Sequence, residues 1–294
     1  MPTIFRDKVI LNDVTFNDAL SLPTGAGDFA IDVMSGWSET PELDAQFAPK
    51  GIVDGVVPPE NFPYGGRIIL LGGYVTAVSR LRLEELWDVI VRDALPRGLP
   101  LRLERHEAVP KYVTAYLSGP REPAWFGNSY AGPTGFRWGA TILCTDPMKY
   151  GLTPQILSAG VAGFASGGRT YPRTYPLEYD TTLDGEGEKV TVTNNGTGSS
   201  KNLVLDITGP LVKGAWRVTN ETTNELLKFD VGLSAGDHLI INFLNETALL
   251  NGFPVSASIV GDFWDLDPGP NVIKLFADYD PAAGFTATAY PAWE

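Results

Sequence analysis

Few residues of this 294-residue chain have the types and spacing that catalysis requires. The chain contains two histidines, His106 and His238, and one cysteine, Cys144. His106 follows an alternating strand pattern and His238 begins one, which favours structural or surface roles over general-base catalysis. Cys144 lies on the apolar side of a strand pattern, so we expect a buried, unreactive thiol. A single cysteine excludes an intrachain disulfide and a zinc site built from several Cys and His ligands.

The remaining chemical motifs are weak. Asp262, Asp265 and Asp267 could offer oxygens to Ca²⁺, but no glutamate closes the loop and the following Pro-Gly favours a turn. The glycine-rich stretch 159–168 is not followed by Lys and Ser or Thr, so it indicates a linker rather than a phosphate site. The sequence also lacks the Gly-x-Ser-x-Gly motif of serine hydrolases. We therefore predict no catalytic residue, no cofactor and no metal site.

Aromatic residues offer one binding hypothesis. Trp216, Trp264 and Trp293 lie in the second half of the chain. If they were exposed and coplanar, their rings could stack on sugars, as in carbohydrate-binding modules. The alternative is that they pack in the core, because aromatic side chains supply much of the buried area in small domains.

Composition limits the function classes. Hydrophobic residues make up 44% of the chain and charged residues only 19%, which indicates a folded protein with a sizeable core. The formal charge is −13, whereas a protein that grips a phosphate backbone is expected to be basic. No segment has the apolar length of a signal peptide or a membrane-spanning helix. We expect synthesis and folding in the cytosol, and no membrane partner.

The first half has a mixed pattern, with one helix. Apolar residues recur at spacings of three and four over about 81–95, and Pro96 and Gly98 end the pattern. Alternating or continuous apolar runs around 29–33, 67–78, 99–104 and 136–144 indicate strands. We expect residues 1–150 to form an α+β domain in which this helix packs on a sheet.

The second half is predicted to be entirely β. Short strand patterns recur at 189–194, 201–208, 214–219, 225–229, 238–243, 271–277 and 286–290, with turn signals such as Asn195-Gly196 and Asn251-Gly252 between them. We expect an antiparallel β-sandwich over 176–294. The Gly- and Pro-rich stretch 151–175 is predicted to be a linker between the two domains.

Short phrases of turn and strand punctuation follow one another along nearly the whole chain. They are GWSETPE at 36–42, GIVDG at 51–55, GRIILLGG at 66–73, YPLEY at 175–179, NNGT at 194–197, LDITG at 205–209, FWDL at 263–266, PGPN at 268–271 and AW at 292–293. Their order resembles the distal tail proteins, or minor tail proteins, of long-tailed, siphovirus-type bacteriophages.

This resemblance implies a mainly β protein. The expected parts are an N-terminal β-barrel-like domain with one helix and a C-terminal galectin-like or carbohydrate-module-like sandwich. It implies a structural, non-enzymatic virion protein at the distal end of the tail, assembled in the host cytoplasm. The implied assembly is a homo-oligomeric ring, expected to be a hexamer, that joins the tail tube protein to the hub, tape measure and baseplate proteins. DNA would pass through the lumen of this ring without specific binding.

Two alternatives stay open at this point. One is a carbohydrate-binding module that contacts a host surface glycan, and the other is a glycoside hydrolase, which needs two carboxylates across a cleft. The polar, turn-rich stretch 36–64 is too long for a simple connection. We expect it to form an extended arm that reaches an adjacent subunit.

Overall fold

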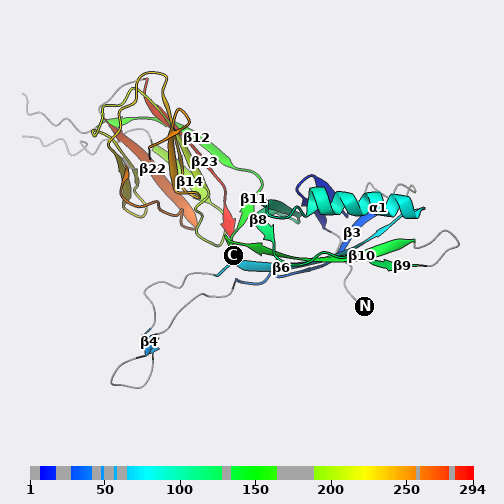
Figure 1. Cartoon of the computed structure of the whole chain (residues 1–294). Coiled ribbons are helices and arrows are strands. Elements are labelled where there is room, and N and C mark those ends of the chain that lie inside the picture. Colours follow the sequence, from blue (N-terminus) through cyan, green and yellow to red (C-terminus); the bar gives the residue numbers. More distant parts are fainter. Residues whose placement is uncertain are drawn as a thin grey trace, which may run out of the picture. The chain divides into compact units, whose positions relative to one another are not determined.

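The computed structural model of the chain describes residues 7–17, 28–41, 48–49, 56–57, 65–127, 134–163, 189–255, 259–277 and 282–294. The chain divides into two compact units, Met1–Leu152 with Glu294, and Thr153–Trp293 (Figure 1). Both are built mainly of antiparallel strands, which confirms the mainly β fold class. Among the described residues, no helix combines the length and hydrophobicity needed to cross a membrane.

The first unit is organised around one long sheet with the strand order β2-β1-β7-β8-β10-β6-β3. The strands are β1 (Lys8–Leu11), β2 (Val14–Phe16), β3 (Asp28–Ser35), β6 (Arg67–Thr76), β7 (Leu101–His106), β8 (Lys111–Leu117) and β10 (Gly135–Cys144). The shorter strands β9 (Ala124–Phe126) and β11 (Lys149–Gly151) pair with β10 and β8, and β4 (Ala48–Pro49) pairs with β5 (Val56–Val57). The longest ladder joins β6 and β10 over their full length.

The first unit is barrel-like, but within the described residues its ladder does not close, and Asn17 bridges the two end strands. Asn17 follows β2 with a φ of 56°, a conformation that asparagine tolerates. Its backbone N–H donates to the Phe29 carbonyl at 3.2 Å. Its side-chain amide donates to the Ile31 carbonyl at 2.9 Å and accepts from the Ile31 N–H at 3.0 Å. One side-chain amide thus replaces a backbone peptide opposite β3.

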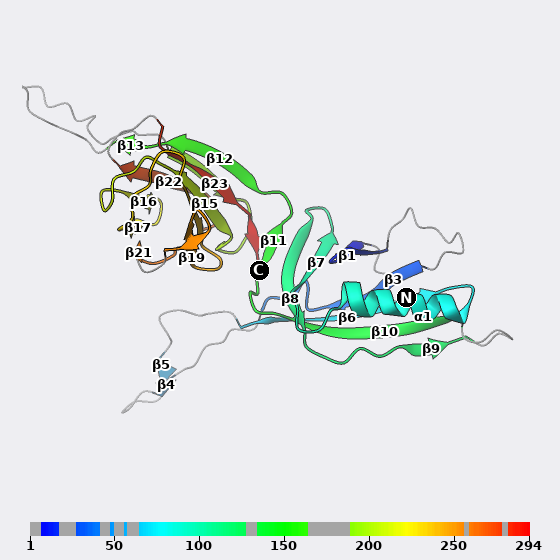
Figure 2. The ribbon, with the colours of Figure 1, turned by 45° about the horizontal axis from the view of Figure 1, so that its top comes forward.

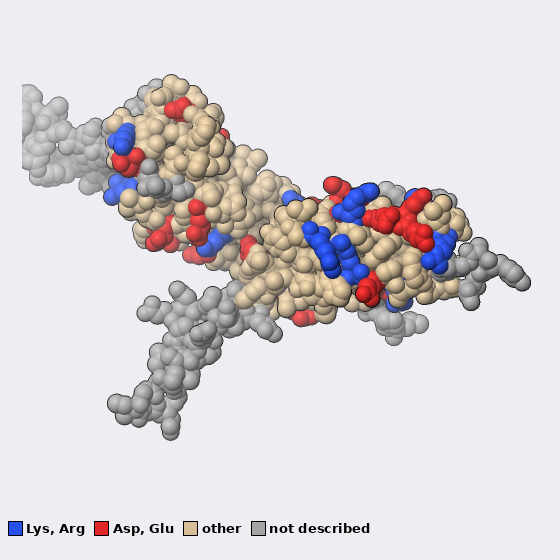
Figure 3. Space-filling model, viewed as in Figure 1, with Lys and Arg blue, Asp and Glu red and all other residues tan. Residues whose placement is uncertain are grey.

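The helical region runs from α1 (Arg80–Val89) directly into a five-residue π-helical segment, Ile90–Ala94. The Ser79 hydroxyl accepts a hydrogen bond from the Arg82 N–H at the first turn, and Pro96 follows the last turn. Leu83 and Leu86 are buried against the sheet, and α1 covers one face of β6 and β10 (Figure 1). Lys, Arg, Asp and Glu side chains are intermixed over this region (Figure 3).

The second unit is a sandwich of two sheets (Figure 2). The first sheet has the order β12 (Gln155–Gly160), β23 (Gly284–Ala289), β15 (Leu203–Thr208), β18 (His238–Asn242), β19 (Thr247–Leu250) and β20 (Phe253–Pro254). The second has the order β13 (Ala162–Gly163), β22 (Gly269–Ala277), β16 (Arg217–Asn220), β17 (Glu225–Phe229) and β21 (Ile259–Val260), with β14 (Lys189–Asn194) paired to β22. A short strand, β24 (Ala292–Trp293), lies near the end of the chain.

Part of the stretch predicted as a linker, 151–175, is instead structured. Strand β12 pairs with β23 along its whole length, and β13 pairs with β22. Gly284 of β23 allows this close pairing, since a Cβ there would lie 2.9 Å from the Ala159 carbonyl oxygen. The rest of the predicted linker, from residue 164, lies outside the described residues. So does the predicted arm between 42 and 64, apart from β4 and β5.

Candidate assembly surface

Part of the outer face of the long sheet in the first unit, centred on β6, is apolar. Along β6, Ile69, Leu71 and Val75 point into the core, while the alternate residues point outward. An antiparallel sheet with one face on a core normally carries polar residues on its other face. In β6 the outward residues include Ile68, Leu70 and Tyr74 instead.

Neighbouring strands extend this surface. We define the apolar sheet face as six outward residues whose exposed fractions lie between 36% and 58%. They are Val33, Ile68, Leu70, Tyr74, Tyr116 and Leu143. The strand register places Leu143 opposite both Ile68 and Tyr116. A contiguous exposed apolar patch of this kind marks an interaction site rather than an ordinary solvent-facing surface.

At the centre of the apolar sheet face, glycine residues leave the backbone uncovered by side chains. Gly72 and Gly139 lie directly opposite each other on β6 and β10, and Val33 lies opposite Gly72 from β3. A Cβ on Gly139 would meet only the Leu71 carbonyl oxygen, at 3.7 Å, so its outward side is open. The absence of side chains lets a partner approach the sheet closely at this point.

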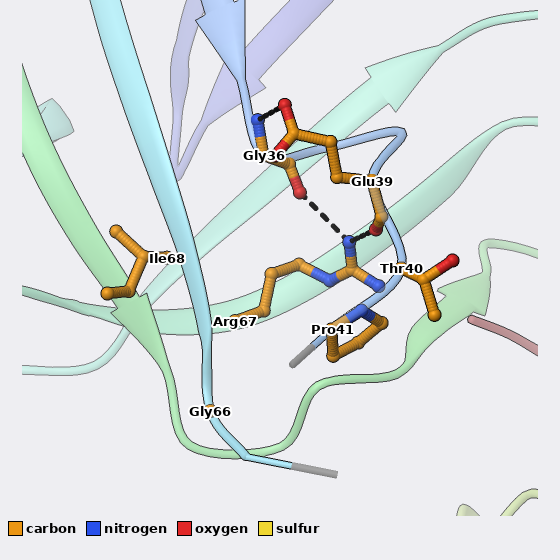
Figure 4. Close-up of a pocket in the computed structure, with 7 residues that line it drawn as sticks. All are labelled: Gly36, Glu39, Thr40, Pro41, Gly66, Arg67 and Ile68. Atoms are coloured by element: carbon orange, nitrogen blue, oxygen red, sulfur yellow. Dashed lines mark hydrogen bonds between the residues drawn. The ribbon is translucent and has the colours of Figure 1, made fainter. Parts of the chain in front are cut away.

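A buried arginine organises the end of this sheet. Arg67, the first residue of β6, is buried and donates to the carbonyls of Gly36, Trp37, Glu39 and Pro147. Figure 4 shows its guanidinium reaching across to the 36–41 loop. Because both 36–41 and 65–67 are tied to this one side chain, it fixes the two points between which residues 42–64 leave and rejoin the sheet.

A cavity of about 170 Å³ adjoins this arginine. It is lined by Gly36, Glu39, Thr40, Pro41, Gly66, Arg67 and Ile68 (Figure 4). The Arg67 Nη2 atom is buried without a hydrogen-bond partner among the described residues. Gly36 has a φ of +87°, and a Cβ there would lie 2.0 Å from the Ile68 carbonyl oxygen, so the loop can lie this close to β6 only with glycine.

A second buried cation supports the same loop. The Lys149 ammonium donates to the Trp37 carbonyl at 3.1 Å. Burial, and secondarily the nearby Arg67, lower the pKa of Lys149 to about 8. Burial also lowers the pKa of Arg67. Among the described residues, the hydrogen-bond acceptors of both cations are backbone carbonyls, so the group positions the loop and offers no acid–base pair.

Two of the three tryptophans considered for sugar stacking belong to the core. Trp216 and Trp264 are each 2% exposed. Trp216 stacks on Phe229 with ring centroids 4.6 Å apart, and its indole N–H donates to the Val231 carbonyl. Trp264 packs against Phe243. Neither ring presents a face to a sugar in this structure, whereas Trp293 is half-buried and remains a prediction.

The other sequence candidates do not form a reactive group. His106 lies near Glu104 and His238 near Asp206, in different units. Cys144 is buried, and desolvation raises the pKa of its thiol to about 12. Among the described residues, no three His, Cys, Asp or Glu side chains gather in a way that could hold a metal ion.

Sequence reasoning missed both main features of the surface. The run Ile68-Ile69-Leu70-Leu71 predicts a strand that is apolar on both sides, which is a signal of burial on both sides. That signal does not say what covers the outer side. Arg67 and Lys149 carry no spacing signal at all, because they are 82 positions apart in the chain.

Comparison with known proteins supports the resemblance found in the sequence. Residues 195–290 match the family described as siphovirus-type tail component, C-terminal domain. The Dit protein (gp 19.1) of phage SPP1, described as a paradigm of the hub adsorption apparatus in phages that infect Gram-positive bacteria, has a similar fold with 14% identity. That similarity has a TM-score of 0.61 and covers 98% of this chain and 99% of the other.

A chain of the phage p2 baseplate in its activated conformation with Sr is also similar, with 14% identity, coverage of 96% and 97%, and a TM-score of 0.44. No curated protein matches the chain in sequence. The matched C-terminal domain confirms the resemblance to siphovirus tail proteins. The similarity to the SPP1 protein shows that both units of the fold occur together in one known chain.

Proposed function

We propose that this chain, whose residues 195–290 form a siphovirus-type tail component domain, is a structural subunit of a phage tail tip. In this proposal six copies close a ring that joins the tail tube to the baseplate or tip proteins. The observation that carries the proposal is the fold similarity to the SPP1 Dit protein over nearly the full length of both chains. The work of the protein is then done by contact surfaces and not by reactive groups.

The apolar sheet face supports an assembled state. An isolated subunit would expose Ile68, Leu70 and Val33 to water, and burying them against another protein is favourable. A closed ring uses heterologous interfaces, in which one surface of each copy meets a different surface of the next. We expect the apolar sheet face to be covered in the assembled tail.

The charge of the chain suits a passage for DNA. Six copies at −13 each carry a formal charge of −78. A lumen wall with this sign would repel phosphates and keep the DNA from sticking to the wall. The expected protein partners are the tail tube protein on one side and the hub and tape measure proteins on the other, and the expected location is the distal end of the tail.

The mass of the purified chain in solution tests this proposal. We expect light scattering and electron microscopy to show rings, either of the chain alone or after addition of the tail tube protein from the same phage. A chain that stays monomeric at high concentration, both alone and with tube protein, would refute the ring. Binding to tube ends without ring formation would retain the tail-tip role and refute the symmetry.

A glycan-binding role for the second unit has less support. The burial of Trp216 and Trp264 removes two of the three stacking residues considered, and leaves the half-buried Trp293. Retention of the wild-type chain on a glycan array, lost on substitution Trp293→Ala, would restore this function. No retention on the array would dismiss it.

A further inference from the structure

Basic residues gather on one sheet of the second unit, although the chain as a whole is acidic. Thr153–Trp293 contains six Lys or Arg residues among those that the structure describes, and four of them lie on strands of the same sheet. We call these four the basic sheet face. They are Lys189 on β14, Lys274 on β22, Arg217 on β16 and Lys228 on β17.

Strand alternation places the four side chains on the outer side of this sheet. Their neighbours Val190, Val218, Leu227 and Leu275 belong to the sandwich core. Side chains of successive strand residues point to opposite faces. The basic sheet face therefore lies opposite the core, where Lys189 and Lys228 are exposed, Arg217 is half-buried and Lys274 is buried.

The strand register sets like charges directly against each other. Lys189 is paired with Lys274 across β14 and β22. Arg217 is paired with Lys228 across β16 and β17. Directly opposed like charges destabilise a sheet, and at the first pair the ion pair of Lys274 with Glu221 offsets part of this cost. A cost of this kind is removed when a negatively charged partner lies over the pairs.

Little of this charge is neutralised within the chain. Lys274 forms an ion pair with Glu221 at 2.7 Å. Lys189 and Lys228 have no ion-pair partner within the described part of the chain. Arg217 lies over the Phe276 ring, 4.9 Å from its centroid, and this contact orients the guanidinium. The charges of Lys189 and Lys228 are therefore not offset by any carboxylate among the described residues.

Apolar side chains are interleaved with the cations. Val260 lies opposite Lys228 on the edge strand and is 64% exposed. Leu226, also exposed, lies opposite Thr219. A surface that binds only the phosphate backbone of a nucleic acid needs cations but no aliphatic contacts. Protein interfaces combine apolar contacts with charged groups at their margin.

We propose that the basic sheet face binds an acidic, partly apolar segment of another protein. The carboxylates of that segment lie over Lys189 and Lys228, and its apolar side chains cover Val260 and Leu226. This inference is independent of the ring, because it concerns the second unit and a different partner. Its test is therefore independent of whether the first unit assembles.

Fluorescence anisotropy tests the proposal with the full chain. The probes are a labelled peptide that alternates Glu with Leu, the same peptide with Lys in place of Glu, and a single-stranded DNA oligonucleotide. We expect binding of the acidic peptide at low salt, weakening as salt rises, and no binding of the basic peptide. Failure to bind the acidic peptide, or tighter binding of DNA, would overturn the proposal.

Matched charge reversals locate the site. Lys189→Glu with Lys228→Glu changes two residues of the basic sheet face, and Lys201→Glu with Lys213→Glu makes the same change in net charge off the face. We expect the double variant on the face to weaken the acidic peptide about tenfold or more, and the control to leave it nearly unchanged. Equal loss in the control would show a non-specific charge effect and refute the assignment. Thermal denaturation separates loss of the site from loss of the fold, and Lys228→Gln gives a milder change if the double variant unfolds.

Discussion

The two units place their charges in opposite ways on comparable sheets. In the first unit the cations Arg67 and Lys149 are buried and held by backbone carbonyls, while the outer face of the sheet around β6 is apolar. In the second unit the core side is apolar, and the cations, such as Lys189 and Lys228, lie on the outer side.

This contrast indicates two kinds of partner. Contact with the apolar sheet face gains free energy from the area removed from water, which salt does not screen. Contact with the basic sheet face depends on charge, which salt does screen. Both outer faces lower the stability of the isolated chain, the first because it exposes apolar area and the second because it opposes like charges. Each is therefore better explained by a partner than by the stability of the free subunit.

The largest effect is expected from charges placed on the apolar sheet face. The double substitution Ile68→Glu and Leu70→Glu puts two carboxylates where the proposal needs a dry contact. We expect the ring to be lost, as measured by light scattering, while the thermal stability of the subunit is kept because both side chains already face water.

The double substitution Val78→Glu and Leu81→Glu is the matched control for this test, because Val78 is exposed and precedes α1. Leu81 is also exposed and apolar in the first unit, but it lies on α1 and not on the outer face of the sheet. Assembly should survive this substitution. If the control abolishes the ring, or if the double variant on the sheet assembles normally, the apolar sheet face is not an assembly surface.

A smaller but still large effect is expected from Arg67→Met. This change leaves the carbonyls of Gly36, Glu39 and Pro147 without their donor. Leaving a buried carbonyl without its donor costs about 1–3 kcal/mol. We expect a loss of this order in the free energy of unfolding, measured by urea denaturation. The exposed Arg137→Met should change it by no more than about 0.5 kcal/mol. Similar values for both variants would show that Arg67 does not hold the loop.

Much of the second unit could be predicted from the sequence because its strands alternate cleanly. Val190 and Val192 alternate with exposed residues, and the expected strand 189–194 coincides with β14. The strand expected at 225–229 likewise coincides with β17. Turns at Asn and Gly residues mark where each pattern ends. Fold class and strand positions therefore follow from local periodicity.

The two outer faces could not be predicted, because each is created by register. Lys189, Arg217, Lys228 and Lys274 are scattered over 86 positions, and only the sheet brings them together. The sequence pattern around Ile68 and Leu70 is the same whether a partner or the chain itself covers these side chains. Tryptophan type alone did not separate core from surface either, so Trp216 could only be weighed and not assigned.

Lys149 should make stability depend on pH. Its pKa is about 8 in the folded chain and 10.5 in an unfolded one, so between these values the unfolded state binds more protons. The free energy of unfolding should therefore rise with pH across this window, by at most about 3 kcal/mol from this group. Lys149→Met should lose this contribution. The measurement is the difference between wild type and variant at pH 8 and at pH 10.5, which cancels other titrating groups, and a constant difference would contradict the assignment.

The smallest expected effect separates the two faces by the sign of a stability change. Lys228→Glu replaces a like-charge pair with an attractive pair opposite Arg217. Cross-strand pairs of this kind contribute about 0.2–1 kcal/mol, so the variant should be slightly more stable than the wild type while it binds the acidic peptide more weakly. Differential scanning calorimetry measures the change. Lys201→Glu, which loses weak ion pairs with Glu246 and Asp265, should be equal to or less stable than the wild type. Replacing a residue that stabilises the fold lowers the stability of the protein. Destabilisation by Lys228→Glu would therefore mean that the opposed cations serve the fold and not a partner.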